Sequence, residues 1–239
     1  MLKFLGRGAG FSDEHNGACF GYEDKLILMD CPMITFKRLK NQGLSCFAGR
    51  AVEEIVVVVT HTHSDHVAGL ALTIHMARFI WKLKVKVVAP SEEVAHDLEY
   101  LLYRLDGCSR ETCTVLTAED YMREEMGREW LKEVIPTVHV PELEGRCFGY
   151  RLSIDGKNVI YTGDTATLEP YLEYLEEGSI LYTECSAYDT GVHIYVDYLT
   201  GYADFFREKD IKVYLMHMDN VEEIKRRTAG TGFETAPLA

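Results

Sequence analysis

Residues 53–66 read EEIVVVVTHTHSDH and place a cluster of metal-binding side chains directly after a hydrophobic strand. Residues two apart in an extended chain face the same side, so His61 and His63 can bind one ion. Asp65 and His66 lie where the chain turns into the next helix and can face a second ion. Imidazole and carboxylate groups without thiolate suit Zn²⁺, Mn²⁺ or Fe. The alternative is a solvated polar turn, which the density of histidines disfavours.

Three further candidate ligands follow later in the chain, each at the carboxyl end of a β-branched run. They are His139 in IPTVHVP, Asp164 in VIYTGDT and His217 in VYLMHMDN. Taken singly, each would be read as an ordinary hydrogen-bonded residue at a strand end. Because all three residues lie at the carboxyl end of a predicted strand, we expect their side chains to meet at one edge of the fold.

The motif H-x-H-x-D-H resembles the signature of the metallo-β-lactamase superfamily. The resemblance implies that His61, His63 and His139 hold a first metal, that Asp65, His66 and His217 hold a second, and that Asp164 bridges them. It also implies that Asp30, in KLILMDC, supports the metal-binding histidines from behind and sets their ring orientation. The expected cofactors are therefore two divalent ions, with Zn²⁺ as the first choice and Mn²⁺ or Fe as alternatives.

Within the superfamily, the pattern DC…HTHSDHVAGL…H…GDT…E…H…H resembles the ribonuclease Z-like and phosphodiesterase branch. That branch has a glutamate and a histidine between the GDT segment and the last ligand, and the histidine assists cleavage. Glu184 in YTECSA and His193 in TGVHIY occupy comparable places. The resemblance implies that His193, oriented by Glu184, gives a proton to the leaving group.

The expected enzyme is a dinuclear metal-dependent hydrolase acting on a small phosphodiester. A hydroxide bridging the two metals would attack phosphorus, and Asp65 would orient that hydroxide. Such a cleavage leaves a phosphomonoester and an alcohol. The departing alkoxide needs a proton, which is the role expected for His193.

Two other function classes remain open from the sequence. A thioester, lactone or other carboxylic ester hydrolase would use the same ligand set, with Tyr188 or Tyr195 as an electrophile. A di-iron redox protein or a non-catalytic binding module would use the fold without hydrolysis. The chain contains no flavin or rubredoxin-like domain that would carry electrons. A true β-lactamase is disfavoured because Asp164 stands where those enzymes commonly have a different ligand.

Composition narrows the choice of partners. The chain has 239 residues, 38 of them acidic and 25 basic, for a formal net charge of −13. Proteins that bind a phosphate backbone need clustered Lys and Arg, so binding of tRNA or another nucleic acid is not expected. A small-molecule substrate is expected instead. Seven scattered cysteines without a C-x-x-C pair, and a start without a signal-peptide core, favour a soluble cytoplasmic protein with reduced thiols. No membrane association is expected, and a homodimer is compatible with the sequence.

The alternation of strand and helix patterns predicts an α/β fold: an αββα sandwich of two mixed β-sheets face to face, with helices outside. The predicted strands are Lys3–Leu5, Ala18–Tyr22, Lys25–Met29, Ile55–Thr60, Lys84–Ala89, Val134–Val138, Cys147–Ile154, Asn158–Thr162, Ile180–Tyr182 and Lys212–Met216. The predicted helices are Ile34–Gln42, His66–Lys82, Glu92–Arg104, Ala118–Met126, Leu168–Leu175, Tyr195–Glu208 and Val221–Arg226. Residues 1–239 are expected to form a single domain.

Overall fold

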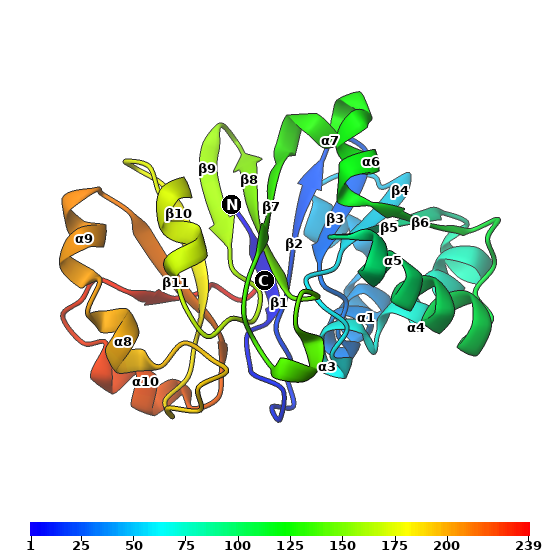
Figure 1. The fold of residues 1–239 in the computed structure, drawn as a ribbon. Helices are drawn as coiled ribbons and strands as arrows, with labels where there is room; N and C mark the ends of the chain where they lie inside the picture. Colours follow the sequence, from blue (N-terminus) through cyan, green and yellow to red (C-terminus); the bar gives the residue numbers. More distant parts are fainter. The chain divides into compact units, whose positions relative to one another are not determined.

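The β-branched runs of the sequence form two six-stranded sheets in a computed structural model that describes residues 1–239. The chain divides into two compact units, each containing one sheet (Figure 1). Unit 1 comprises Met1–Arg7, Asp13–Tyr121 and Pro237–Ala239, and unit 2 comprises Gly8–Ser12 and Met122–Ala236. The expectation that residues 1–239 form a single domain stays a prediction.

The sheet of unit 1 is mixed, and its strands follow one another in chain order. The strands are β1 (Lys3–Gly6), β2 (Gly17–Tyr22), β3 (Lys25–Met29), β4 (Glu54–Val58), β5 (Lys84–Ala89) and β6 (Cys113–Thr117). Strands β1 to β3 pair antiparallel, whereas β3 to β6 pair parallel. Residues 55–58 of β4 are buried, as an apolar run in the interior of a parallel sheet should be. The carboxyl end of β4 leads directly into the histidine-rich segment.

Unit 1 confirms the helix predicted over 34–42, whereas two longer predicted helices are interrupted. Its helices include α1 (Met33–Gln42), α2 (Leu44–Ala48), α3 (Ser64–Val67), α4 (Leu70–Met76) and α5 (Glu92–Glu99). The prediction of a single helix over 66–82 is wrong. The helix is interrupted at Gly69, and the helical stretch ends in the π-helical segment Ala77–Trp81. The helix predicted over 92–104 likewise continues beyond α5 as the π-helical segment Tyr100–Leu105. Figure 1 shows α1, α3, α4 and α5 beside the strands of this sheet.

Gly69 permits a close approach of two segments that matter for the site. A Cβ atom at this position would lie 2.3 Å from the backbone oxygen of Pro32. The backbone N–H of Gly69 also donates to the carbonyl of Cys31 at 2.9 Å. The residue at the break between α3 and α4 is therefore in contact with the segment that follows Asp30.

We expect Gly69→Ala to lower the free energy of unfolding by about 1–3 kcal/mol, because the backbone around Pro32 must shift to admit the methyl group. Chemical denaturation measures the loss. Gly201→Ala is the control: its backbone is right-handed helical, and its added Cβ would meet only oxygens of its own turn. Equal stability of Gly69→Ala and the wild type would contradict the close packing of this glycine.

Unit 2 contains a second mixed sheet, in the order β12-β11-β10-β9-β8-β7. Its strands are β7 (Leu131–Pro136), β8 (Phe148–Ile154), β9 (Lys157–Tyr161), β10 (Ile180–Cys185), β11 (Lys212–Met218) and β12 (Glu234–Thr235). Strands β9 to β12 are parallel, and β8 is antiparallel to both β7 and β9. The carboxyl ends of β7, β9, β10 and β11 therefore lie at the same edge of this sheet.

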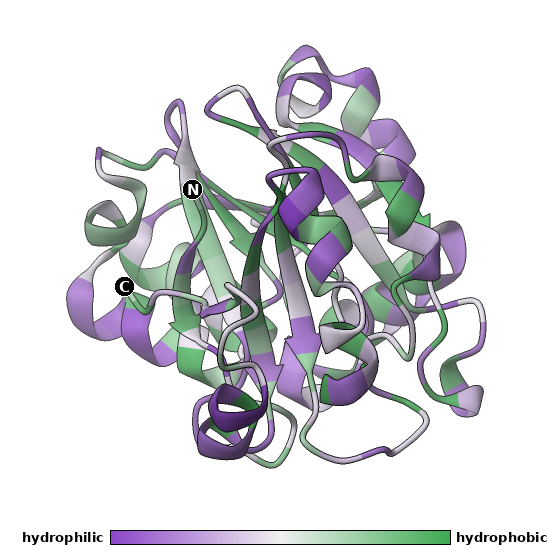
Figure 2. Ribbon diagram, turned by 90° about the vertical axis from the view of Figure 1, so that its left-hand side faces the viewer, coloured by the Kyte–Doolittle hydropathy of each residue, from purple (hydrophilic) through white to green (hydrophobic).

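Helices cover one face of the second sheet and bury a continuous core. They include the 3-10 helix η4 (Glu169–Tyr174), α8 (Val196–Thr200), α9 (Ala203–Glu208) and α10 (Val221–Arg227), and α7 (Glu125–Trp130) packs against β7 and β8. The core joins Leu181 and Leu215 of the strands to Leu199, Phe206 and Ile224 of the helices. Figure 2 shows the hydrophobic colour concentrated on the strands, while the helices alternate between the two colours, as amphipathic helices do.

Ten predicted strands are confirmed, with shifts of a few residues at some ends, and β6 and β12 were not predicted. Both are edge strands, and β6 is largely half-buried, so its sequence has little of the apolar run that marks an interior strand. The helix predicted over 195–208 is divided into α8 and α9. The helix predicted over 118–126 is likewise divided into α6 (Ala118–Arg123) and α7. Residues 169–174 form a 3-10 helix instead of the predicted α-helix.

No helix is both long enough and apolar enough to cross a membrane. All seven cysteines are free thiols, and every one except Cys46 is buried. Burial raises the pKa of Cys31 to about 12, so this thiol stays protonated at neutral pH. The six buried cysteines therefore act as small hydrophobic residues of the core.

Candidate metal centre

The histidine-rich segment of unit 1 brings its four candidate ligands together on one turn. His61 and His66 are buried, while His63 and Asp65 are partly exposed. Nε2 of His61 lies 3.0 Å from Nδ1 of His63, so the two nitrogens face the same point. Two nitrogens on one tetrahedral Zn²⁺, each at about 2.0–2.1 Å, would be separated by about 3.3 Å. The pair therefore has the spacing that a shared ion requires.

Asp30 fixes the orientation of two of these rings. Its carboxylate accepts hydrogen bonds from Nδ1 of His66 at 2.8 Å and from the Thr60 hydroxyl at 2.9 Å. The Thr60 hydroxyl in turn lies 3.0 Å from Nδ1 of His61 and can accept its proton. Because Nδ1 of His61 and of His66 carries the proton of these hydrogen bonds, Nε2 of each ring carries no proton and could bind a metal. The supporting role expected for Asp30 is therefore matched by its geometry, and Thr60 is a relay that the sequence reasoning missed.

The second set of candidate ligands meets at the edge of the sheet in unit 2. His139 follows β7, Asp164 follows β9, and His217 lies within β11. One carboxylate oxygen of Asp164 is 3.3 Å from Nε2 of His217 and 3.8 Å from Nε2 of His139. All three side chains are nearly inaccessible to solvent. A buried carboxylate oxygen this close to two imidazole nitrogens is a donor set that could hold a divalent ion.

A β-bulge turns His217 toward this edge. The pairing of β10 with β11 passes from Glu184 opposite Met216 to Cys185 opposite Met218, so His217 is the extra residue. Its φ of 45° lies in the left-handed region that non-glycine residues seldom adopt. Bulges of this kind redirect a side chain out of the regular alternation of a strand. The bulge therefore decides where the His217 ring lies.

Glu184 and His193 form a hydrogen-bonded pair beside these ligands. Nδ1 of His193 donates to Glu184 at 2.6 Å, and the backbone N–H of Thr165 donates to the other oxygen of the same carboxylate. The His193 ring centroid is 4.8 Å from that of His139 and 5.4 Å from that of His217. Burial lowers the pKa of His193, but the charge and hydrogen bond of Glu184 outweigh it, and the pKa lies above its ordinary value. A histidine held protonated in this way is suited to donate a proton.

The loop that carries His193 also orients a candidate ligand. Nδ1 of His139 donates to the backbone carbonyl of Val192 at 2.8 Å, which turns Nε2 toward Asp164. Neither Val192 nor this backbone contact could be recognised in the sequence, because a carbonyl group has no residue-type signature. The two tyrosines considered as electrophiles differ in setting: Tyr188 is exposed, whereas the Tyr195 hydroxyl accepts a hydrogen bond from Arg227 at 2.7 Å.

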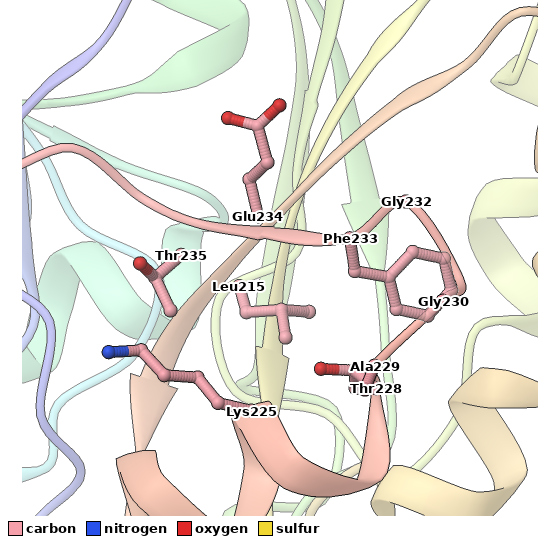
Figure 3. A pocket seen from close by; sticks show the side chains of 9 residues that line it. All are labelled: Leu215, Lys225, Thr228, Ala229, Gly230, Gly232, Phe233, Glu234 and Thr235. Atoms are coloured by element: carbon pink, nitrogen blue, oxygen red, sulfur yellow. The ribbon is translucent and has the colours of Figure 1, made fainter.

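A separate cleft of unit 2 lies away from these residues. It has a volume of about 660 Å³ and is lined by residues of β11, α10, β12 and the glycine-rich segment before β12 (Figure 3). The charged side chains that line it are Lys225 and Glu234, which oppose each other in sign. None of the candidate site residues lines it, and it contains no histidine or cysteine. Its size alone therefore gives no reason to place the chemistry there.

Comparison with known proteins identifies the family. A family model described as anti-Pycsar protein Apyc1 matches residues 1–236. The chain belongs to the anti-Pycsar protein Apyc1 family. An Apyc1 protein of Bacillus phage vB_BsuM-Goe3 is 28% identical over 255 residues, covering 97% of this chain and 94% of the relative. That of Bacillus phage BSP38 is 25% identical over 254 residues, covering 98% and 94%.

Solved structures place this Apyc1-family chain in the metallo-β-lactamase fold. The metallo-β-lactamase fold protein YhfI from Bacillus subtilis matches with a TM-score of 0.73 at 14% identity, covering 100% of this chain and 95% of that one. A diphosphatase of the PhnP family matches with a TM-score of 0.67 at 17% identity, covering 100% and 95%. Human tRNase Z, short form, matches with a TM-score of 0.63 at 18% identity, covering 99% and 96%. The fold expected from the sequence is confirmed.

Proposed function

We propose that this chain is a metal-dependent phosphodiesterase. The observation that carries the proposal is the position of Asp164, whose carboxylate oxygen lies between the Nε2 atoms of two buried histidines. A buried carboxylate beside several imidazoles matches the oxygen and nitrogen ligands that Zn²⁺, Mn²⁺ and Fe prefer. The ligand set of unit 1, with no thiolate in it, has the same chemistry. The donor sets therefore fit the two divalent ions that the resemblance implies.

When bound, two divalent cations lower the pKa of water and stabilise negative charge on the phosphate in the transition state. The protein's own groups do the rest. Asp30 and Thr60 hold the rings of unit 1 in place before substrate arrives, and Val192 does so for His139. His193 presents Nε2, because its Nδ1 proton is committed to Glu184. Its Nε2 proton passes to the oxygen that leaves phosphorus.

The substrate we propose is a cyclic nucleotide. A net charge of −13 is unfavourable for a polyanion but tolerates a ligand with a single phosphodiester charge. Hydrolysis adds water across one ester P–O bond, giving a phosphomonoester and a free hydroxyl group on the same molecule. The leaving group is a poor alkoxide, which explains the need for a proton donor at His193.

A substrate panel tests this function. Purified protein with Zn²⁺, Mn²⁺ or Fe²⁺ should hydrolyse a 3′,5′-cyclic nucleotide and bis(p-nitrophenyl) phosphate, and phosphate-ester products are measured by chromatography and absorbance. A thioester and a lactone should react at least about tenfold more slowly, since the proposed site is complementary to the transition state of a phosphodiester and not to that of an acyl transfer. Cleavage of the thioester or lactone with every phosphodiester inert would reject the proposal in favour of a carboxylic ester hydrolase.

The Glu184–His193 pair favours hydrolysis over the redox alternative. Electron transfer at a di-iron centre has no need for a carboxylate-oriented imidazole outside the ligand set. Tyr195, one of the two electrophiles considered for carbonyl substrates, is engaged by Arg227. The arrangement of unit 2 thus supports phosphodiester cleavage over both other classes.

A further inference from the structure

The segment that carries His193 is a loop with an exposed middle and a closed base. We define the His193 loop as residues 187–193, which lie between β10 and α8. Residues 188–191 are exposed, and Gly191 has a φ of 72°. At the base, the N–H of Ser186 donates to Ile194 at 2.8 Å, and the N–H of Val196 donates to Ser186 at 2.9 Å. The backbone therefore brings the two ends of the loop together.

Asp219 holds the first end of this loop. It directly follows β11, two residues after His217. Its carboxylate accepts the Ser186 hydroxyl at 2.6 Å and the backbone N–H of Ala187 at 2.9 Å. Hydrogen bonds to a carboxylate are short and strong compared with neutral ones. Asp219 thus ties the start of the loop to the strand that carries a candidate ligand.

Arg227 holds both ends at once. Its guanidinium donates to the carbonyl of Ala187 at 3.1 Å and to the Tyr195 hydroxyl at 2.7 Å. The same group lies 4.7 Å from the centroid of the Tyr195 ring and pairs with Asp197. A planar guanidinium with several donors can bridge such partners, which an ammonium group cannot do in the same geometry. The Arg227 side chain is only 17% exposed, so these contacts form in a packed setting.

We propose that Asp219 and Arg227 are positioning residues that clasp the base of the His193 loop and so hold His193 in its working place. The inference rests on the proposed function, because it assigns to the clasp the task of keeping the proton donor beside the scissile bond. Hydrogen-bond partners of this outer kind change activity by about 10- to 100-fold when they are removed. The clasp acts through His193 and touches no substrate atom itself.

Arg227→Met is the test variant, and Arg226→Met is its matched control. Methionine keeps an unbranched stem but removes every donor of the guanidinium. Arg226 is the neighbouring arginine of α10; its side chain is 70% exposed, and it pairs with Glu223 on the same helix. With metal in excess, Arg227→Met should hydrolyse a 3′,5′-cyclic nucleotide about 10- to 100-fold more slowly than the wild type, mainly through kcat. It should hydrolyse bis(p-nitrophenyl) phosphate within about threefold of the wild-type rate, because nitrophenolate leaves without a proton. Arg226→Met should match the wild type on both substrates.

The double variant Arg227→Met/His193→Ala tests whether Arg227 acts by positioning His193 or by a separate effect on the structure of the enzyme. If Arg227 works through His193, the double variant should hydrolyse the cyclic nucleotide within about threefold of His193→Ala alone. A loss equal to the product of the two single losses would overturn the proposal. Equal slowing of both substrates by Arg227→Met, or the same effect from Arg226→Met, would overturn it as well.

Hydrogen exchange tests the clasp independently of turnover. The amides of residues 186–196 should exchange faster in Arg227→Met than in Arg226→Met, while those of β9 and β11 keep their protection. Unchanged exchange in this segment would overturn the clasp even if the enzyme is a phosphodiesterase. Wild-type protein that cleaves no phosphodiester would instead reject the proposed function, and the exchange comparison would still decide whether Arg227 holds the loop.

Discussion

Replacing His63 by alanine is expected to remove one of two bound metal ions per chain and to slow hydrolysis by about 10³-fold or more. The imidazole of His63 faces the same point as that of His61. A lost cation removes several kcal/mol of charge stabilisation in the transition state, and each 1.36 kcal/mol is a tenfold change in rate. Elemental analysis of protein purified without chelator measures the metal, and the phosphodiester assay measures the rate.

His75→Ala is the control for this experiment. His75 lies on α4 of the same unit and contacts the carbonyl of Asp106 at 3.2 Å, outside the histidine-rich segment. This variant should keep both ions and the wild-type rate. Wild-type protein that is active and reproducibly free of metal would contradict the dinuclear centre, as would a His63→Ala variant that retains two ions.

Replacing His193 by alanine is expected to leave both metals bound and to reduce hydrolysis of a cyclic nucleotide by about 10²- to 10⁴-fold, the usual contribution of a positioned acid. The loss should be much smaller for bis(p-nitrophenyl) phosphate, whose leaving group departs without a proton. The physical reason is the hydrogen bond of Nδ1 to Glu184, which leaves the Nε2 proton for transfer. Comparing kcat/KM for the two substrates measures the selectivity.

The comparison of the two leaving groups also distinguishes a catalytic role of His193 from a structural one. A His193 that only stabilised the loop would slow both substrates alike and lower the midpoint of thermal unfolding. Unchanged rates on both substrates would make His193 a bystander, and equal losses would reject its role as an acid. Metal content determined on the same samples excludes the loss of an ion as the cause.

Much of the candidate metal centre could be predicted, because the residue types and spacing that suit a metal ion are visible in a short stretch of sequence. Histidine and carboxylate groups at H-x-H-x-D-H spacing identify a metal site whatever the rest of the chain does. A buried parallel strand such as β4 appears as an apolar run, so its carboxyl end could be located closely. His139, Asp164 and His217 could be named because each follows or ends such a run.

The helices were harder to predict, for a physical reason. The apolar pattern over residues 66–82 continues through a break at Gly69, where the backbone packs against Pro32, more than thirty residues away in the chain. The spacing of hydrophobic residues indicates which face of a helix is buried. It does not show where a segment that is distant in the sequence approaches that helix. The strand β6 was missed because an edge strand buries too little surface to require a regular apolar pattern.

The sequence by itself determined the metal-binding motif, the order of the candidate ligands and the fold class. Only the tertiary structure decided how those side chains are aimed: Asp30 and Thr60 orient the rings of unit 1, and the bulge at His217 turns that ring toward Asp164. Likewise, only the fold brings Arg227 to both ends of the His193 loop. Residue type sets which chemistry a side chain can perform, whereas its direction depends on contacts between segments that lie far apart in the chain.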